Sequence, residues 1–275
     1  MNAELSWQKR EGTHWVRGLA PLLGRENRKW WHGRRWIVQL LIWVGLLDGL
    51  LAFALYVLPQ MAVTKGVPIP PEEALGIGKQ MFFGLGAIGL AIGAIVLLQD
   101  AIIEEKSTGT AEWVLSKPVS RSAYVLSKLL PNLLALPVVM LLVPGTIGYF
   151  LFRSFDGTAV PLGNFLISEG IVAVNLLFYI TLTLLLGVLL NSRAPLLGIA
   201  LGSLLGGSLV PIPEIIQFTP WKLGELVLLP VMGQALPLFV LTMLVSTVIW
   251  SIIFVAVAIW KFNNSCYAQI ARRLT

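Results

Sequence analysis

Cysteine, histidine and charged residues are all scarce in this chain of 275 residues. The single cysteine, Cys266, cannot form an internal disulfide, which excludes a disulfide-stapled secreted scaffold. The two histidines, His14 and His32, lie apart from any carboxylate cluster, and no metal-ligand spacing or hydrolase motif is present. These absences argue against an intramembrane enzyme, which needs titratable groups that converge on one site.

The chain is richer in hydrophobic residues and poorer in charged residues than a soluble domain. Charged residues make up 12% of the chain and hydrophobic residues 56%, whereas a soluble domain has about 25% and 45–50%. A membrane helix needs about 20 mostly apolar residues to cross roughly 30 Å of hydrocarbon, and no run alternates as a membrane β-strand does. We therefore expect an all-α polytopic membrane protein with six spans, at Ile37–Leu58, Met81–Leu98, Leu129–Phe152, Ile167–Leu190, Pro195–Val210 and Leu236–Trp260.

The distribution of basic residues predicts the orientation. Six spans place both termini on one side, and that side would hold sixteen of the 20 Lys and Arg residues. Basic residues concentrate on the cytoplasmic side of membrane proteins, so both the N-terminus and the C-terminus are expected in the cytosol. The predicted organisation is a cytosolic segment 1–36, a transmembrane domain 37–260 and a cytosolic tail 261–275.

Two segments do not fit a simple span. In residues 14–36, Trp and Leu alternate with Arg and Lys, which predicts an amphipathic helix on the inner membrane surface, interrupted at Pro21 and Gly24. It is either a basic anchor or a contact for a partner; nucleic acid is excluded because no nucleic-acid-binding fold surrounds it. Residues 211–235 are too apolar for a solvated loop and too rich in proline for a span, which favours a re-entrant hairpin on the outer face.

Glycines repeat every four residues in two of the predicted spans. Glycine at this spacing lets helix backbones approach closely in lipid. We favour packing within one bundle over a seam between two copies of the chain. The helix-packing candidates are Gly89, Gly93, Gly198, Gly202 and Gly206.

The loop 99–128 between the second and third spans has the most informative pattern. Gly109 permits a tight reversal, and Thr110 can cap a helix that Pro118 limits to about two turns. Ser120 can then cap the helix that enters the third span. The predicted result is a short cytosolic helix that is rigidly joined to two spans, so that a push on it moves both.

The same loop carries a recognisable motif, Glu-Glu-x-x-x-Gly-Thr-x-Glu-x-x-Leu-x-x-Pro-Val-Ser-Arg. This run, in this position, resembles the permease subunit of ABC-2-type ATP-binding cassette transporters. The basic segment before the first span, the broken hairpin and the Asn191-Ser-Arg-Ala-Pro195 turn are similar as well. The matching positions are Glu104, Glu105, Gly109, Thr110, Glu112, Leu115, Pro118, Ser120 and Arg121.

The resemblance implies an exporter fold in which this loop carries a coupling helix that docks on a separate ATPase. It also implies a working unit of two ATPase chains and two permease chains, either identical or related. The chain itself has no P-loop to cradle phosphates, because the nearest string, Gly76-Ile-Gly78-Lys79, lacks the pattern. No cofactor is therefore expected in this chain, and ATP and Mg²⁺ would be bound by the partner.

An ion-coupled carrier or channel is the alternative function. An acid inside a span is a functional candidate by default, and Asp48 lies near the middle of the first span. We favour a hydrogen bond from a neighbouring helix or a second copy to Asp48 over a substrate contact, and Glu169 is expected near the interface. The nearly charge-free spans suggest an amphipathic or lipid-like cargo, exported across a prokaryotic plasma membrane.

Overall fold

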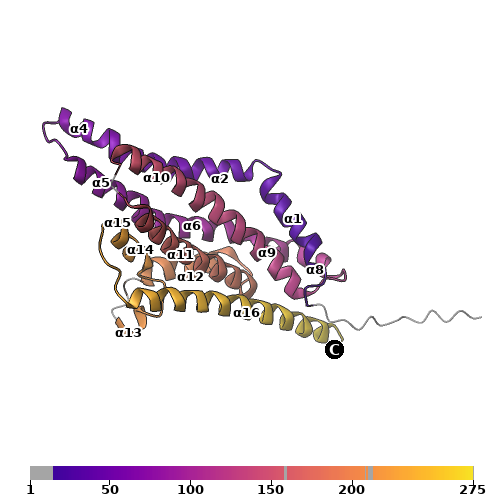
Figure 1. Ribbon diagram of the computed structural model, residues 1–275. Coiled ribbons are helices and arrows are strands. Elements are labelled where there is room, and N and C mark those ends of the chain that lie inside the picture. The colour runs from indigo at the N-terminus through magenta and orange to yellow at the C-terminus, as the bar shows by residue number, and fades with distance from the viewer. Residues whose placement is uncertain (1–14, 158–159, 208, 210–212, 275) are drawn as a thin grey trace, which may run out of the picture.

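The computed structural model describes residues 15–157, 160–207, 209 and 213–274, with the backbone alone at Glu112, 213–214 and 265–274. Every regular element in these residues is a helix, and none is a strand, so the all-α prediction is confirmed. Figure 1 shows an elongated bundle with α4 and α5 at one end and α1 and α8 at the other. We call the end with α1 and α8 the basic end.

In the part of the chain that the structure describes, five helical runs are long and apolar enough to cross a membrane: Arg35–Thr64, Pro71–Ser107, Arg121–Phe155, Leu162–Leu189 and Phe239–Asn264. The first comprises α2 (Arg35–Trp43), η1 (Val44–Asp48), α3 (Gly49–Ala52), η2 (Phe53–Val57) and α4 (Leu58–Thr64). The second comprises α5 (Pro71–Lys79), η3 (Gln80–Leu85), α6 (Gly86–Leu98) and α7 (Asp100–Ser107). The third comprises α9 (Arg121–Leu136), η4 (Pro137–Leu142) and α10 (Val143–Phe155), and the last two are α11 (Leu162–Leu189) and the apolar part of α16 (Phe239–Leu274).

The predicted fifth span, Pro195–Val210, corresponds to α12 (Arg193–Gly207), which has only 15 residues. At 1.5 Å per residue this helix is about 22 Å long, short of the roughly 30 Å of a hydrocarbon core. Among the described residues, five span-length helices and one shorter apolar helix are therefore found where six spans were expected.

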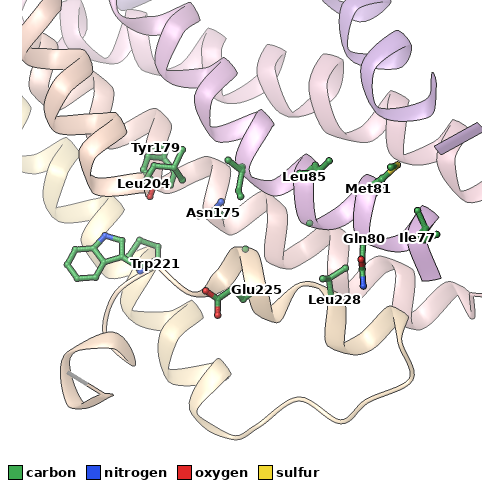
Figure 2. A pocket seen from close by; sticks show the side chains of 14 residues that line it. Ile77, Gln80, Met81, Leu85, Asn175, Tyr179, Leu204, Trp221, Glu225 and Leu228 are labelled. Atoms are coloured by element: carbon green, nitrogen blue, oxygen red, sulfur yellow. The ribbon is translucent and has the colours of Figure 1, made fainter. Parts of the chain in front are cut away.

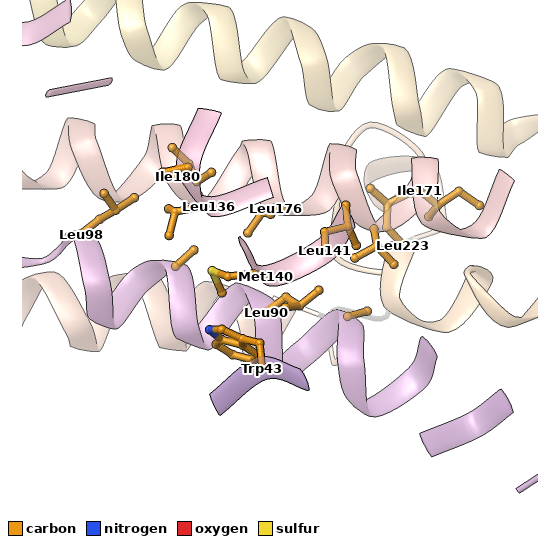
Figure 3. Packing of buried hydrophobic residues seen from close by; sticks show 14 of the residues in the cluster. Trp43, Leu90, Leu98, Leu136, Met140, Leu141, Ile171, Leu176, Ile180 and Leu223 are labelled. Atoms are coloured by element: carbon orange, nitrogen blue, oxygen red, sulfur yellow. The ribbon is translucent and has the colours of Figure 1, made fainter. Parts of the chain in front are cut away.

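Helix α11 lies at the centre of the bundle and packs against α6, α9, α12 and α16. In Figure 1, α16 runs along one edge of the molecule and α2 and α10 run along the opposite edge. Figure 3 shows the buried residues that meet between these layers. They include Trp43, Leu90, Leu136, Met140 and Leu176, from α2, α6, α9, η4 and α11.

The second span is longer than predicted at both ends. Pro71 occupies the first turn of α5, where no backbone N–H is required, and Glu72 and Glu73 there complement the helix dipole. Helix therefore replaces most of the loop expected near residues 59–80. The apolar pattern gave only Met81–Leu98, because polar residues extend the helix beyond its lipid-facing part.

The N-terminal amphipathic helix is not interrupted. Helix α1 (Leu19–Trp31) runs through both Pro21 and Gly24. Pro21 is the third residue of the helix. The first four N–H groups of a helix make no hydrogen bond within it, so the proline removes none. The interruption of the helix lies instead at residues 32–34, between α1 and the first span.

The described residues of the predicted outer hairpin, 213–235, which we call the outer segment, contain three short helices: α13 (Pro213–Ile216), α14 (Leu223–Leu226) and α15 (Leu228–Val231). Hydrogen bonds attach it to α11, α12 and α16. Ser168 donates to the carbonyl of Val227 (2.7 Å), Trp221 Nε1 donates to Ser203 Oγ (3.2 Å), and Trp250 Nε1 donates to the Phe218 carbonyl (3.1 Å). Residues 208 and 210, at the end of the predicted fifth span, and 211–212, at the start of the predicted hairpin, lie outside the described residues.

Candidate functional site

The loop between the second and third spans folds into a short helix between two turns. Helix α8 (Thr110–Leu115) has six residues. Gly109, just before it, has φ +71°, a conformation that side chains with a Cβ rarely adopt. At the far end, Ser120 caps α9 by accepting a hydrogen bond from the Ala123 N–H (3.2 Å). The expected reversal, two-turn helix and second cap are thus present.

Thr110 is not the helix cap that the sequence suggested. It is the first residue of α8, and the Gly109 carbonyl accepts from the Trp113 N–H (3.1 Å). The Thr110 hydroxyl lies 2.9 Å from that of Thr108. The helix therefore begins one residue earlier, because glycine in the left-handed conformation completes the turn without a side-chain cap.

The residues singled out from the motif do not form one exposed surface. Glu104 and Pro118 are exposed, Gly109, Thr110, Leu115, Ser120 and Arg121 are half-buried, Glu105 is buried, and the side chain of Glu112 is not described. The exposed side of α8 also carries Trp113, 60% exposed, whose ring lies 3.7 Å from Lys117 Nζ. Sequence reasoning missed Trp113, although an indole in a short hydrophilic loop is itself a signal of a contact.

Glu105 belongs to a buried ionic network rather than to the surface. Lys128 Nζ lies 2.6 Å from Glu105 Oε1 and 2.9 Å from Glu26 Oε1. Tyr124 donates its hydroxyl to the other Glu105 oxygen (2.8 Å), and Arg25 and Lys29 lie 3.5 Å from the carboxylate. The network joins α1, α7 and α9, and its members are satisfied by one another, as buried charges require.

A second hydrogen-bond chain joins the same helices. Trp30 Nε1 donates to Asn132 Oδ1 (2.8 Å), and Asn132 Nδ2 donates to the Lys128 carbonyl (2.6 Å). Trp30 is almost fully buried. Helix α1 is therefore docked on the third span by its indole as well as by its charges.

The residues before α1 are bound to the loop itself. The Ser120 N–H donates to the Arg17 carbonyl (2.9 Å), and the hydroxyls of Ser120 and Ser122 donate to the carbonyl of Trp15. Gly18 has φ +80°, and a Cβ there would lie 2.8 Å from a methyl of Val119. The segment predicted as an anchor on the membrane is thus in contact with the loop 99–128.

Further contacts link the loop to α11, α12 and α16. Lys106 Nζ donates to the carbonyls of Gly187 (3.1 Å), Val188 (2.7 Å) and Leu190 (2.9 Å) at the C-terminus of α11, where a cation also complements the helix dipole. Arg193 pairs with Asp100, and Arg121 donates to the carbonyl of Asn263. The loop therefore contacts α1, α9, α11, α12 and α16.

A cavity of about 540 Å³ lies toward the other end of the bundle, between η3, α11, α12 and the outer segment. Its walls are mostly apolar, with polar groups from Gln80, Asn175, Tyr179, Trp221 and Glu225 (Figure 2). A concave apolar site with a few convergent polar groups is typical of small-molecule binding sites.

The two glycine repeats differ in their surroundings. A Cβ on Gly93 would lie 2.2 Å from the Trp43 ring and 2.8 Å from Met140, so this glycine packs within the bundle. A Cβ on Gly198, Gly202 or Gly206 would meet no atom within 4 Å. The prediction that the glycines pack within one bundle is therefore wrong for α12, whose glycines face open space in the single chain.

Asp48 is buried, 4% exposed, and neither of its carboxylate oxygens has a hydrogen-bond partner in the described part of the chain. The expected hydrogen bond from a neighbouring helix is therefore absent among these residues. Glu169 is half-buried, with one oxygen that is enclosed and unpartnered.

Comparison with known families identifies the family of this chain. A family model described as "ABC-2 family transporter protein" matches residues 32–216. This range covers more than half of the chain, so the chain belongs to the ABC-2 transporter family, and the resemblance inferred from the loop is confirmed. With its span-length apolar helices, the protein is a multi-pass membrane permease of an ATP-binding cassette transporter. No curated protein matches the chain.

Proposed function

We propose that this permease uses α8 to receive force from a separate ATPase and exports an amphipathic or lipid-like cargo. The observation that carries the proposal is the set of contacts between the loop and α1, α9, α11, α12 and α16. A displacement of α8 would act on all of these helices, because packed elements move as units. In this proposal ATP and Mg²⁺ are bound by the ATPase, and the complex lies in a prokaryotic plasma membrane.

The exposed side of α8 suits a protein contact. Trp113 is 60% exposed among the residues that the structure describes, and tryptophan is enriched at the energetic centres of interfaces. Trp113 stacks with Lys117, and the neighbouring Ser116 and Pro118 are also exposed. These residues form a small amphipathic surface on the exposed side of α8 and the turn after it.

The working unit is proposed to hold two ATPases and two permease chains, identical or related. The open glycine face of α12 supports close approach of a second permease, because small residues allow helix backbones to pack in lipid. The cavity lies between this helix and α11. A cargo with an apolar body and a small polar group would match its walls.

Site-specific cross-linking and ATP turnover test the coupling role of α8. In a Cys266→Ser background, a photoreactive cross-linker on Ser116→Cys should join the permease to a chain identified by mass spectrometry as an ABC ATPase. Trp113→Ala should reduce that cross-link and the ATP hydrolysis of the purified complex by at least about tenfold, the effect of losing a hot-spot residue. Trp260→Ala, which removes a tryptophan of similar exposure (63%) on α16, is the matched control.

Normal turnover and cross-linking in Trp113→Ala would contradict the docking assignment. Replacing Glu112 and Leu115 together gives a second check, since the motif places both at the same contact. That double variant should fold in membranes and lose coupling.

The cavity is tested separately by filling it. Gly84 lines the cavity, and Gly84→Leu should remove stimulation of ATP turnover by amphipathic compounds while basal turnover persists. Gly76→Leu, on the same run of helix but outside the cavity lining, should leave stimulation intact. Equal stimulation in both variants would exclude this cavity as a cargo site.

A further inference from the structure

Two carboxylates face the same glycine surface inside the bundle. Gly145 and Gly148 are three residues apart on α10, so they lie on one face of the helix. A Cβ on Gly148 would lie 3.2 Å from Asp48 Oδ1, and a Cβ on Gly145 would lie 3.0 Å from the carboxyl carbon of Glu169. Asp48 comes from η1 and Glu169 from α11, so three separate spans build this arrangement.

The two carboxylates contact neighbouring positions on the same face of α10, about one helical turn apart. Asp48 is more than nine-tenths buried and has no hydrogen-bond partner in the described residues, and one Glu169 oxygen is in the same state. An ionised carboxylate without a partner is very costly in a dry interior, and a second negative charge nearby raises that cost. The pair therefore needs a compensating positive charge.

The surrounding cations do not supply that charge. Lys79 on α5 interacts with Asp156, and Arg153 on α10 lies beside the Tyr149 hydroxyl (3.5 Å). Tyr56 on η2 shares a hydrogen bond with Ser154 (2.7 Å). Glu225 on α14 lines the outer cavity, and its own charge is negative. Among the described residues, no ion pair includes Asp48 or Glu169.

A bare metal ion is poorly suited to this position. Hard cations need about six oxygen ligands, and no third Asp, Glu, His or Cys joins the pair in the described residues. The Phe82 ring also lies against the glycine face, within 2.6 Å of the Cβ position of Gly148. A proton needs no coordination shell, and a carboxyl that carries one is neutral.

We propose that Asp48 and Glu169 form a proton-binding pair in the membrane interior of this permease, facing Gly145 and Gly148. The proposal goes beyond ATP-driven transport and does not depend on the docking of α8. It assigns to the permease a bound proton that exchanges when η1, α10 or α11 moves. Asp48 is the last residue of a π-helical segment, a feature that is frequent at functional sites.

Labelling with dicyclohexylcarbodiimide tests the pair, because this apolar reagent modifies protonated carboxyls in membranes. The full-length protein is treated in lipid vesicles over a range of pH, and adducts are located by mass spectrometry. We expect adducts on Asp48 and Glu169 that decrease as the pH rises and that do not change when Na⁺ replaces K⁺. Exposed Glu72 and Glu73 serve as internal controls and should remain unlabelled.

Two results would overturn the proposal. The first is no adduct on either residue at any pH at which the protein stays folded. The second is protection by Na⁺ at fixed pH, which would assign the site to a metal ion. In Asp48→Asn and Glu169→Gln, the adduct should be lost at the replaced residue only, which ties each signal to its position. Neither outcome bears on the cross-linking of α8, so the two proposals fail independently.

Discussion

At the scale of single residues, close contacts decide which positions tolerate change. Gly89 and Gly93 both lie on α6 and both face Trp43, yet their free space differs. The sequence shows the same repeat for both, because spacing places a glycine on a helix face but does not reveal which ring lies opposite. The opposing Trp43 comes from another span, and only the packed structure shows it.

We predict that Gly93→Ala destabilises the protein by about 1–3 kcal/mol, the usual cost of overpacking. The new methyl group would lie 2.2 Å from the Trp43 ring, which must move. Gly89→Ala, with the ring at 3.9 Å, should leave the free energy of unfolding unchanged or slightly higher. Denaturant unfolding in detergent, followed by tryptophan fluorescence, measures both; equal stabilities would contradict the close contact.

The ionic network gives a second residue-scale prediction. Lys128→Met leaves buried Glu105 without its nearest cation, and the free energy of unfolding should fall by about 3 kcal/mol. Lys29→Met removes a charge from a side chain that is 44% exposed and lies 3.0 Å from Glu26, so its cost should stay below about 1 kcal/mol. Thermal unfolding of both variants in the same detergent tests the difference, and similar losses would argue against the buried role of Lys128.

At the scale of elements, the turn residues of the loop predicted its short helix, whereas helix continuity and helix ends elsewhere were not predicted. Proline and serine signals in the loop correctly predicted a two-turn helix and the cap at Ser120. The same proline rule failed at Pro21, because a proline near the start of a helix removes no hydrogen bond. Helix ends beyond the apolar stretch, such as α5, also could not be found from hydropathy, which reports the lipid-facing part alone.

Gly109 provides the element-scale prediction. It has open space around its Cβ position, so a substitution there acts only through the backbone conformation. Gly109→Val should cost roughly 1–2 kcal/mol in the left-handed region and displace α8, which lowers ATP turnover of the complex. Gly109→Asn, which tolerates that region better, should retain more turnover. Identical turnover in the two variants would show that the turn does not set the position of α8.

At the scale of the whole molecule, the all-α class and family followed from composition and one motif. The ionic contacts within the bundle could not be predicted from the sequence, because the partners of Lys106, Lys128 and Asp100 are far away in sequence. The approach of Asp48 and Glu169 to one face of α10 was not predicted, for the same reason. Each acid alone was visible, but no pattern places 48 beside 169.

The orientation of the bundle is a prediction that labelling can test. In a Cys266→Ser background, Ser116→Cys and Val67→Cys should react with an impermeant thiol reagent from opposite sides of the membrane. Both positions are exposed, so each should be accessible in intact cells or in inverted vesicles, but not in both. Reaction of both from the same side would overturn the topology.

The docking of α1 on α9 also constrains the order in which the protein is assembled. Trp30 and Asn132 are separated by 102 residues, as are Glu26 and Lys128. Helix α1 is therefore synthesised before its partner and remains undocked until two further spans have been made and the third begins. Contacts of such long range form late in folding. The docking of α1 on α9 is thus a late step of folding. A bulky tag fused close to Trp15 would obstruct it.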